Sequence, residues 1–247
     1  MWRAHLYKEY RLLGTPVFFI ALAISWFALG WFLVSGLLEY QAIAAKLAGL
    51  ENKRGATETL LGSASRVLQW LMILWSIYFG ARCLASERLW HTDALLYGVR
   101  GGFYRLVFSK ILVLMSAQGL LCLPFWLFAY WLSLSSAWDH CLLVALALAQ
   151  VFLVFYTTLL SLVVSATQKQ PLPASLLLAL LWLLLWLLPV LTTTPLWLVE
   201  ILRWFSPFEH IALLHRGIAS MQTLIFFVIH CLFFATLIPL FWTRETS

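Results

Sequence analysis

Six long apolar runs constrain the fold of this chain more than any other feature of its sequence. They cover Pro16–Leu38, Val67–Leu84, Ile111–Leu132, Cys141–Ser165, Ser175–Leu191 and Leu224–Trp242. A helix needs roughly 17–25 mainly apolar residues to cross the hydrocarbon core of a bilayer. The runs are continuously apolar and do not alternate, which favours helices over the strands of a barrel. The sequence therefore predicts an all-α membrane protein, with six transmembrane helices in a single domain over residues 1–247.

The composition agrees with this class and leaves no room for a sizeable soluble domain. The chain has 247 residues, of which 63% are hydrophobic and 11% charged, whereas a soluble domain is about half apolar and about a quarter charged. Basic loops facing the cytosol explain the net charge of +6, so no nucleic-acid partner is predicted. The four Cys residues form no C-x-x-C pair, which indicates neither a disulfide framework nor a zinc site.

The distribution of basic residues gives an orientation. With the N-terminus inside, ten of the 16 Lys and Arg side chains fall on inner segments and six on outer ones. This bias predicts a multi-pass membrane protein with both termini in the cytosol. The outer segment Glu39–Gly62 is polar, and we expect it to extend the first two spans beyond the membrane.

The N-terminal segment Trp2–Leu13 is predicted to be a short helix outside the spans. Its apolar residues include Leu6 and Leu13, and Lys8, Glu9 and Arg11 stand between them. This pattern suits an interfacial helix on the inner leaflet. An ordinary basic flank is the alternative.

The stretch Ser86–Lys110 is the longest polar interruption between two apolar runs. It has helical character around Thr92–Tyr97, where Thr92 and Asp93 are suited to cap a helix. A short helix between two spans, on the basic side of the membrane, predicts a contact with a cytosolic partner.

The outer segment Leu196–Met221 contains two short apolar helices separated by Ser206 and Pro207. Neither helix is long enough to span, so we expect a re-entrant hairpin that dips into the outer leaflet between spans five and six. Ser206 as N-cap, Pro207 at the first helical position and Glu209 three residues after the cap predict a capping box. Gly217 is the expected stop of the second helix.

The polar stretch resembles the cytosolic loop of ABC-2 type transporter permeases, which has the form E-R-x-x-G-T-x-E-L-L, then Pro, then Lys. In an ungapped register the chain matches it at Glu87, Arg88, Thr92, Leu95, Leu96 and Lys110. It departs from the pattern at His91, which stands for Gly, at Ala94, which stands for Glu, and at Arg100, which stands for Pro.

A second stretch resembles the same family. SPFEHIALLHRGIAS is similar to S-P-x-x-H-F-x-x-F-x-R-G-x-x-[DS] of the gliding-motility and nitrous-oxide-reductase-maturation branch. The matching residues are Ser206, Pro207, His210, Arg216 and Gly217. The resemblance implies a permease subunit of an ATP-driven exporter in a bacterial inner membrane, which pairs with a second permease copy or a paralogue. It also implies a coupling helix over Glu87, Arg88, His91, Thr92, Asp93, Leu95 and Leu96 that docks on a separate ATPase subunit.

The chain has no G-x-x-x-x-G-K-[ST] loop, so ATP and Mg are expected on that partner and no cofactor or metal on this chain. Few ionisable groups interrupt the apolar runs, which argues against an ion-coupled transporter. His230 is the only one well inside a run, and Arg82 lies near an inner end. For His230 we expect a neutral ring that is hydrogen-bonded to a neighbouring helix.

Two other functions stay open at this point. The first is a membrane-embedded enzyme with a site at Glu209, His210 and His215 on the outer hairpin, although H-E-x-x-H spacing is absent. The second is a non-transporting scaffold that recruits an ATPase to the membrane.

Overall fold

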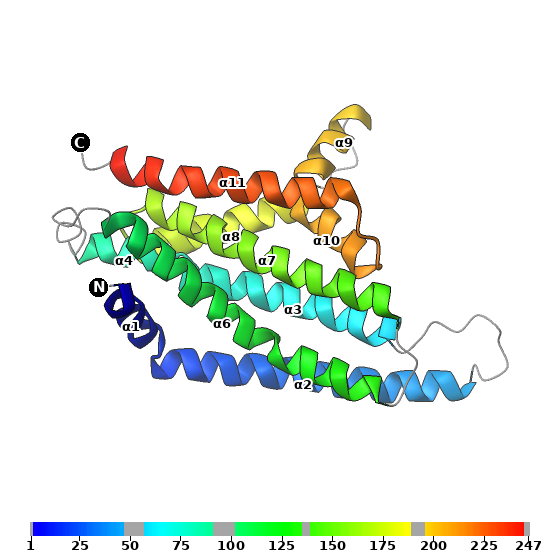
Figure 1. Ribbon diagram of the computed structural model, residues 1–247. Helices are drawn as coiled ribbons and strands as arrows, with labels where there is room; N and C mark the ends of the chain where they lie inside the picture. Colours follow the sequence, from blue (N-terminus) through cyan, green and yellow to red (C-terminus); the bar gives the residue numbers. More distant parts are fainter. Residues whose placement is uncertain (1, 47–56, 91–101, 135–138, 189–195, 245–247) are drawn as a thin grey trace.

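The chain folds into a bundle of helices that run roughly parallel to one long axis (Figure 1). The computed structural model describes residues 2–46, 57–90, 102–134, 139–188 and 196–244, and within these ranges it contains no strand. The elements are α1 (Trp2–Leu13), α2 (Pro16–Lys46), the π-helix η1 (Thr57–Leu61), α3 (Gly62–Trp75), the π-helix η2 (Ser76–Gly80), α4 (Arg82–Leu89), α6 (Gly102–Ser133), α7 (His140–Thr167), α8 (Pro171–Leu187), α9 (Leu196–Phe205), α10 (Pro207–His215) and α11 (Met221–Arg244).

Five helical segments are long and apolar enough to cross a membrane, which confirms a multi-pass membrane protein. They are Pro16–Ile43, Thr59–Leu89, Phe103–Ser133, His140–Thr167 and Met221–Trp242. The fifth predicted run corresponds to α8, a shorter apolar helix of 17 residues. The expected helix over Trp2–Leu13 is present as α1. As expected of the first outer segment, α2 continues past the apolar run to Lys46.

The second span is built from four pieces, η1, α3, η2 and α4. The π-helical turn η2 ends at Gly80, where the Ala81 amide donates to the Ser76 carbonyl over 3.0 Å. The Leu84 and Ala85 amides, at the start of α4, donate to Ser165 Oγ of α7 over 2.8 and 2.9 Å. A side chain of α7 therefore satisfies amides of a span whose regular helix is interrupted.

Helix α7 lies at the centre of the bundle. It packs against α3, α4, α6, α8, α10 and α11, and 67% of its most apolar stretch is buried, against 22% for α2 and for α11. Buried side chains tie it to α6, since Thr157 Oγ1 donates to Gln118 Oε1 over 2.8 Å and Trp126 Nε1 donates to Gln150 Oε1 over 2.7 Å. The peripheral helices instead expose large apolar side chains, such as Phe27 of α2 and Leu232 of α11.

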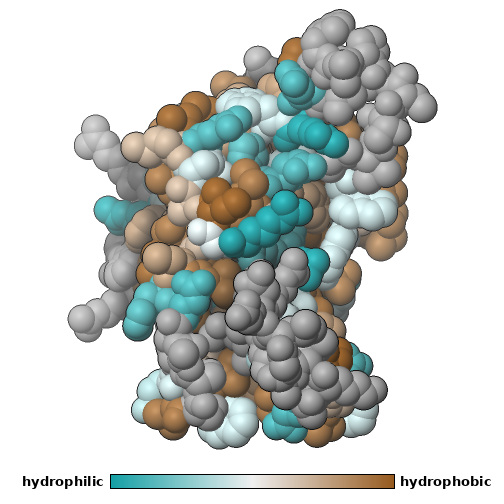
Figure 2. Space-filling model, turned by 90° about the vertical axis from the view of Figure 1, so that its right-hand side faces the viewer, coloured by the Kyte–Doolittle hydropathy of each residue, from teal (hydrophilic) through white to brown (hydrophobic). Residues whose placement is uncertain are grey.

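The ends of the bundle differ from its apolar sides. The helix α1, the end of α4, the start of α6 and the end of α11 all lie at one end (Figure 1). At the opposite end, where η1 and α7 begin, hydrophilic residues gather over the middle of the surface (Figure 2). Apolar sides and polar ends are what a bundle needs when its long axis crosses a bilayer.

Candidate functional site

Four charged residues are buried in the described part of the chain, and all four lie at the end of the bundle that holds α1. They are Glu9 of α1, Glu87 and Arg88 of α4, and Lys110 of α6. Glu87 and Arg88 precede the connection over residues 91–101, and Lys110 follows it by about two helical turns. A buried charge is costly unless it is paired, so the partners of these groups show what the cluster does.

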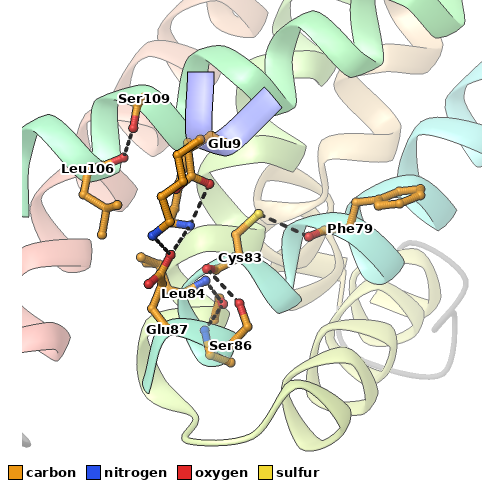
Figure 3. Close-up of polar contacts among 12 residues, drawn as sticks. Glu9, Phe79, Cys83, Leu84, Ser86, Glu87, Leu106 and Ser109 are labelled. Atoms are coloured by element: carbon orange, nitrogen blue, oxygen red, sulfur yellow. Dashed lines mark hydrogen bonds and ion pairs between the residues drawn. The ribbon is translucent and has the colours of Figure 1, made fainter. Parts of the chain in front are cut away.

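Lys110 is the centre of an ion-pair cluster that joins three helices. Its Nζ donates to Glu9 Oε2 over 2.9 Å and to Glu87 Oε1 over 3.3 Å. The half-exposed Lys8 donates to the same Glu87 oxygen over 3.2 Å. Figure 3 shows the Glu9 and Glu87 side chains pointing toward one another with these ion pairs between them. Two acids and two bases balance, so α1, α4 and α6 are held together by a neutral set of charges.

Arg88 links the end of α4 to the end of α11. Its guanidinium lies 4.5 Å from the centre of the Trp242 ring, and Nη2 donates to the Phe241 and Trp242 carbonyls over 3.3 and 3.5 Å. The Trp242 ring also stacks on Phe103, in the first turn of α6, at 5.3 Å between centroids. The two flanks of the 91–101 connection are therefore fixed to α1 and α11 as well as to each other.

The structure places only part of the predicted coupling segment. Glu87 and Arg88 make the contacts just described within the chain, whereas the resemblance placed them in a segment that docks on an ATPase subunit. His91, Thr92, Asp93, Leu95 and Leu96 lie outside the described residues, so their role as a coupling helix stays a prediction.

Sequence reasoning missed the roles of Glu9 and Lys110. It assigned Glu9 to an interfacial helix and Lys110 to the lysine that closes the loop resembling ABC-2 permeases. The available signal was Lys110 alone, which directly precedes the run Ile111–Leu132, where an unpaired charge would be costly. Glu9 stands among charged residues seven positions before the first run, and nothing in the sequence marks it as a partner of Lys110.

The predicted outer hairpin consists of α9 and α10, joined at Ser206, and α9 projects from the side of the bundle (Figure 1). Ser206 has the extended backbone of an N-cap and Pro207 is the first helical residue, as predicted. The capping-box prediction is wrong, because the Ser206 side chain makes no cap hydrogen bond. Its hydroxyl instead donates to the Leu185 carbonyl of α8 over 3.0 Å, since Ser206 is buried against that helix.

The end of α10 is as predicted. Gly217 has a φ of 81°, a conformation that suits glycine. Its amide donates to the Leu214 carbonyl over 3.0 Å, and the Ile218 amide donates to the Leu213 carbonyl over 3.0 Å. This is a Schellman end, and Arg216 at the C-cap is exposed.

His210 of α10 is buried between α9 and α11. Its Nε2 donates to the Trp204 carbonyl over 3.0 Å, its Nδ1 lies 3.4 Å from Thr223 Oγ1, and its ring stacks on Phe226 with 4.1 Å between centroids. Burial lowers the pKa of His210, which keeps the ring neutral and suits these packing contacts.

His215 occupies a different site, where its Nε2 lies 3.0 Å from Ser65 Oγ of α3. Burial, with a smaller effect of the nearby Arg66 charge, lowers the pKa of His215 to about 4. Glu209 is partly exposed and lies 4.0 Å from Arg203 Nε. His210 and His215 therefore lie in separate surroundings, and within the described residues no group of three or more His, Cys, Asp or Glu side chains is arranged to hold a metal ion.

His230 departs from its expected contact. Its Nδ1 donates to the Phe226 carbonyl of its own helix over 2.8 Å, and not to a neighbouring helix. The ring lies among Tyr156, Trp204 and Phe234, so an aromatic cluster surrounds it.

A comparison with protein-family models gave no match to this chain, and a search of curated proteins found no similar sequence.

Proposed function

We propose that this chain is a permease subunit of an ATP-driven exporter in a bacterial inner membrane. ATP and Mg would bind to a separate ATPase subunit, which contacts the 91–101 connection, and a second permease copy or a paralogue would complete the transport path. The two stretches that resemble ABC-2 permeases support the family, and the five long apolar helices support a polytopic membrane protein.

One observation supports the coupling role above the others. Every buried Asp, Glu, Lys and Arg in the described residues belongs to contacts that tie α4 and α6, the helices on either side of residues 91–101, to α1 and α11. A partner that pushes on this connection would therefore move four elements together, because buried ion pairs and packed aromatic rings resist separate motion. Such joint motion would suit mechanical coupling to an ATPase.

We also propose that α8 crosses the membrane, which would give six spans and place both termini in the cytosol. Helix α8 begins near the end of the bundle that holds α1, and α11 begins at the opposite end (Figure 1). The segment from α8 to α10 must therefore carry the chain from one end to the other. At about 1.5 Å per residue, the 17 residues of α8 cover most of a hydrocarbon core.

The test is to tag the chain in its native membrane, extract it in mild detergent, and measure which proteins copurify and whether the complex hydrolyses ATP. We expect a stoichiometric ATPase, and we expect Leu95→Pro to abolish its recovery because proline would break the predicted coupling helix. Glu87→Lys is a poorer test, since Glu87 is buried in ion pairs and its reversal would disturb the bundle itself.

The matched control is Leu50→Pro, which makes the same change in the connection between α2 and η1. It should keep the ATPase. A chain that purifies without any ATP-binding protein would overturn the proposal. An ATPase that copurifies but drives no transport would favour the scaffold function.

A further inference from the structure

A cavity of about 380 Å³ lies beside the ion-pair cluster, between α1, the start of α2, α4 and α6. Its wall includes Thr15 and Val17, at the beginning of the first span, so the cavity lies at the depth where hydrocarbon gives way to headgroups. Leu12 and Val17 also line it, and both are more than half exposed on the outside of the bundle. The cavity is therefore open to the surrounding lipid.

One carboxylate that lines this cavity has an oxygen without a partner. Glu9 lines the cavity and is 5% exposed, and its Oε2 accepts from Lys110. Its Oε1 is buried and has no hydrogen-bond partner within the described residues. A buried carboxylate oxygen is costly without a donor, so the site is suited to a ligand that brings an N–H group.

A second charged group lines the same cavity and is exposed. The Arg82 guanidinium lies 4.1 Å from the centre of the Tyr78 ring, and it has no ion pair with any acid in the described residues. Guanidinium groups bind phosphate oxygens with well-matched geometry. The cavity thus combines an acceptor for an amine, a donor for a phosphate and an apolar wall.

We propose that this cavity binds the headgroup of a phospholipid that carries a primary amine. The ammonium group donates to Glu9 Oε1, the phosphate contacts Arg82, and an acyl chain follows Leu12 and Val17 outward. A choline headgroup has no N–H and leaves Glu9 Oε1 without a donor. The lipid-binding site does not depend on the exporter proposal, because it rests only on the cavity and its charges.

The experiment is native mass spectrometry of the purified full chain, titrated with phosphatidylethanolamine or with phosphatidylcholine of the same acyl chains. We expect the amine lipid to bind about tenfold more tightly, which is the effect of one hydrogen bond to a charged group. Glu9→Gln should remove this preference, and Arg82→Gln should weaken the binding of both lipids. Leu13→Trp, which fills the cavity and leaves its charges in place, should abolish binding even if Glu9→Gln is unstable.

Glu200→Gln is the matched control, because it makes the same change on the exposed part of α9, and it should keep the preference. Equal binding of the two lipids to the unaltered chain would overturn the proposal. A preference that persists in Glu9→Gln or in Leu13→Trp would also overturn it.

Discussion

At the scale of single residues, Gly80 lets two spans approach closely. A Cβ atom added there would stand 2.6 Å from the Ser161 Cβ of α7, which is closer than packed atoms allow. The absence of a side chain at position 80 therefore lets η2 touch α7, next to the point where Ser165 satisfies two amides of α4.

We predict that Gly80→Ala destabilises the protein by about 1–3 kcal/mol, the usual cost of overpacking. The measurement is thermal unfolding in detergent, followed by tryptophan fluorescence. Gly80→Ala with Ser161→Gly should recover much of the loss, since the second change removes the atoms that clash. An alanine variant as stable as the original chain would show that the two helices separate readily.

His215 predicts a pH dependence of stability. Its pKa is about 4 in the folded chain, against an ordinary value of 6.5, so protons bind the unfolded chain more readily. Stability should be complete above about pH 6.5 and fall as the pH drops toward 4, by up to about 3 kcal/mol from this group. Unfolding measured at pH 7.5 and 4.5 should show this loss, and His215→Gln should reduce it. An unchanged slope in His215→Gln would contradict the assignment.

At the scale of elements, the sequence predicted the helices well and the polar contacts between them poorly. The apolar runs predicted the long helices because a bilayer demands about 20 apolar residues from each. The contacts of Glu9 with Lys110 and of Arg88 with the end of α11 were out of reach, because they join residues 101 and about 150 positions apart. A local sequence pattern indicates helical periodicity and helix caps. It does not indicate which distant helix packs against a given residue.

The same limit explains the outcome at Ser206. The Ser-Pro-x-Glu pattern predicted the place where α10 begins, and the structure confirms that place. It also predicted that the Ser206 hydroxyl caps the helix. In the structure this hydroxyl donates to the Leu185 carbonyl of α8 instead, a contact between distant residues that the local pattern does not contain.

We predict that Lys110→Met destabilises the bundle by about 3–5 kcal/mol, because it leaves buried carboxylates without their main cation. Lys110→Met with Glu9→Gln should be less harmful, since Lys8 still pairs with Glu87. Lys169→Met, an exposed lysine in the turn between α7 and α8, is the control and should be nearly neutral. If Lys110→Met alone is at least as stable as Lys110→Met with Glu9→Gln, then Glu9 and Lys110 are not energetically coupled.

At the scale of the whole molecule, the arrangement of the helices predicts the sidedness of the connections. Helix α1, the end of α11 and the turn between α7 and α8 lie at one end, and the start of α11 lies at the other (Figure 1). Six crossings would place residue 169 and residue 203 on opposite sides of the membrane.

The check is to introduce Lys169→Cys or Arg203→Cys into a chain without its native cysteines, and to label intact cells with a membrane-impermeant maleimide. We expect Arg203→Cys to be labelled from outside and Lys169→Cys only after permeabilisation. Labelling of both from the same side would show that α8 does not cross.

The ion pair between Glu9 and Lys110 also has a consequence for biogenesis. During synthesis Glu9 emerges long before Lys110, which follows 101 positions later. Helix α1 can therefore take its final place only after two spans have been inserted and the third has begun to enter the membrane. The contacts of Arg88 form later still, because its carbonyl partners Phe241 and Trp242 follow it by 153 and 154 positions. The charged end of the bundle can therefore be completed only after α11 has been synthesised.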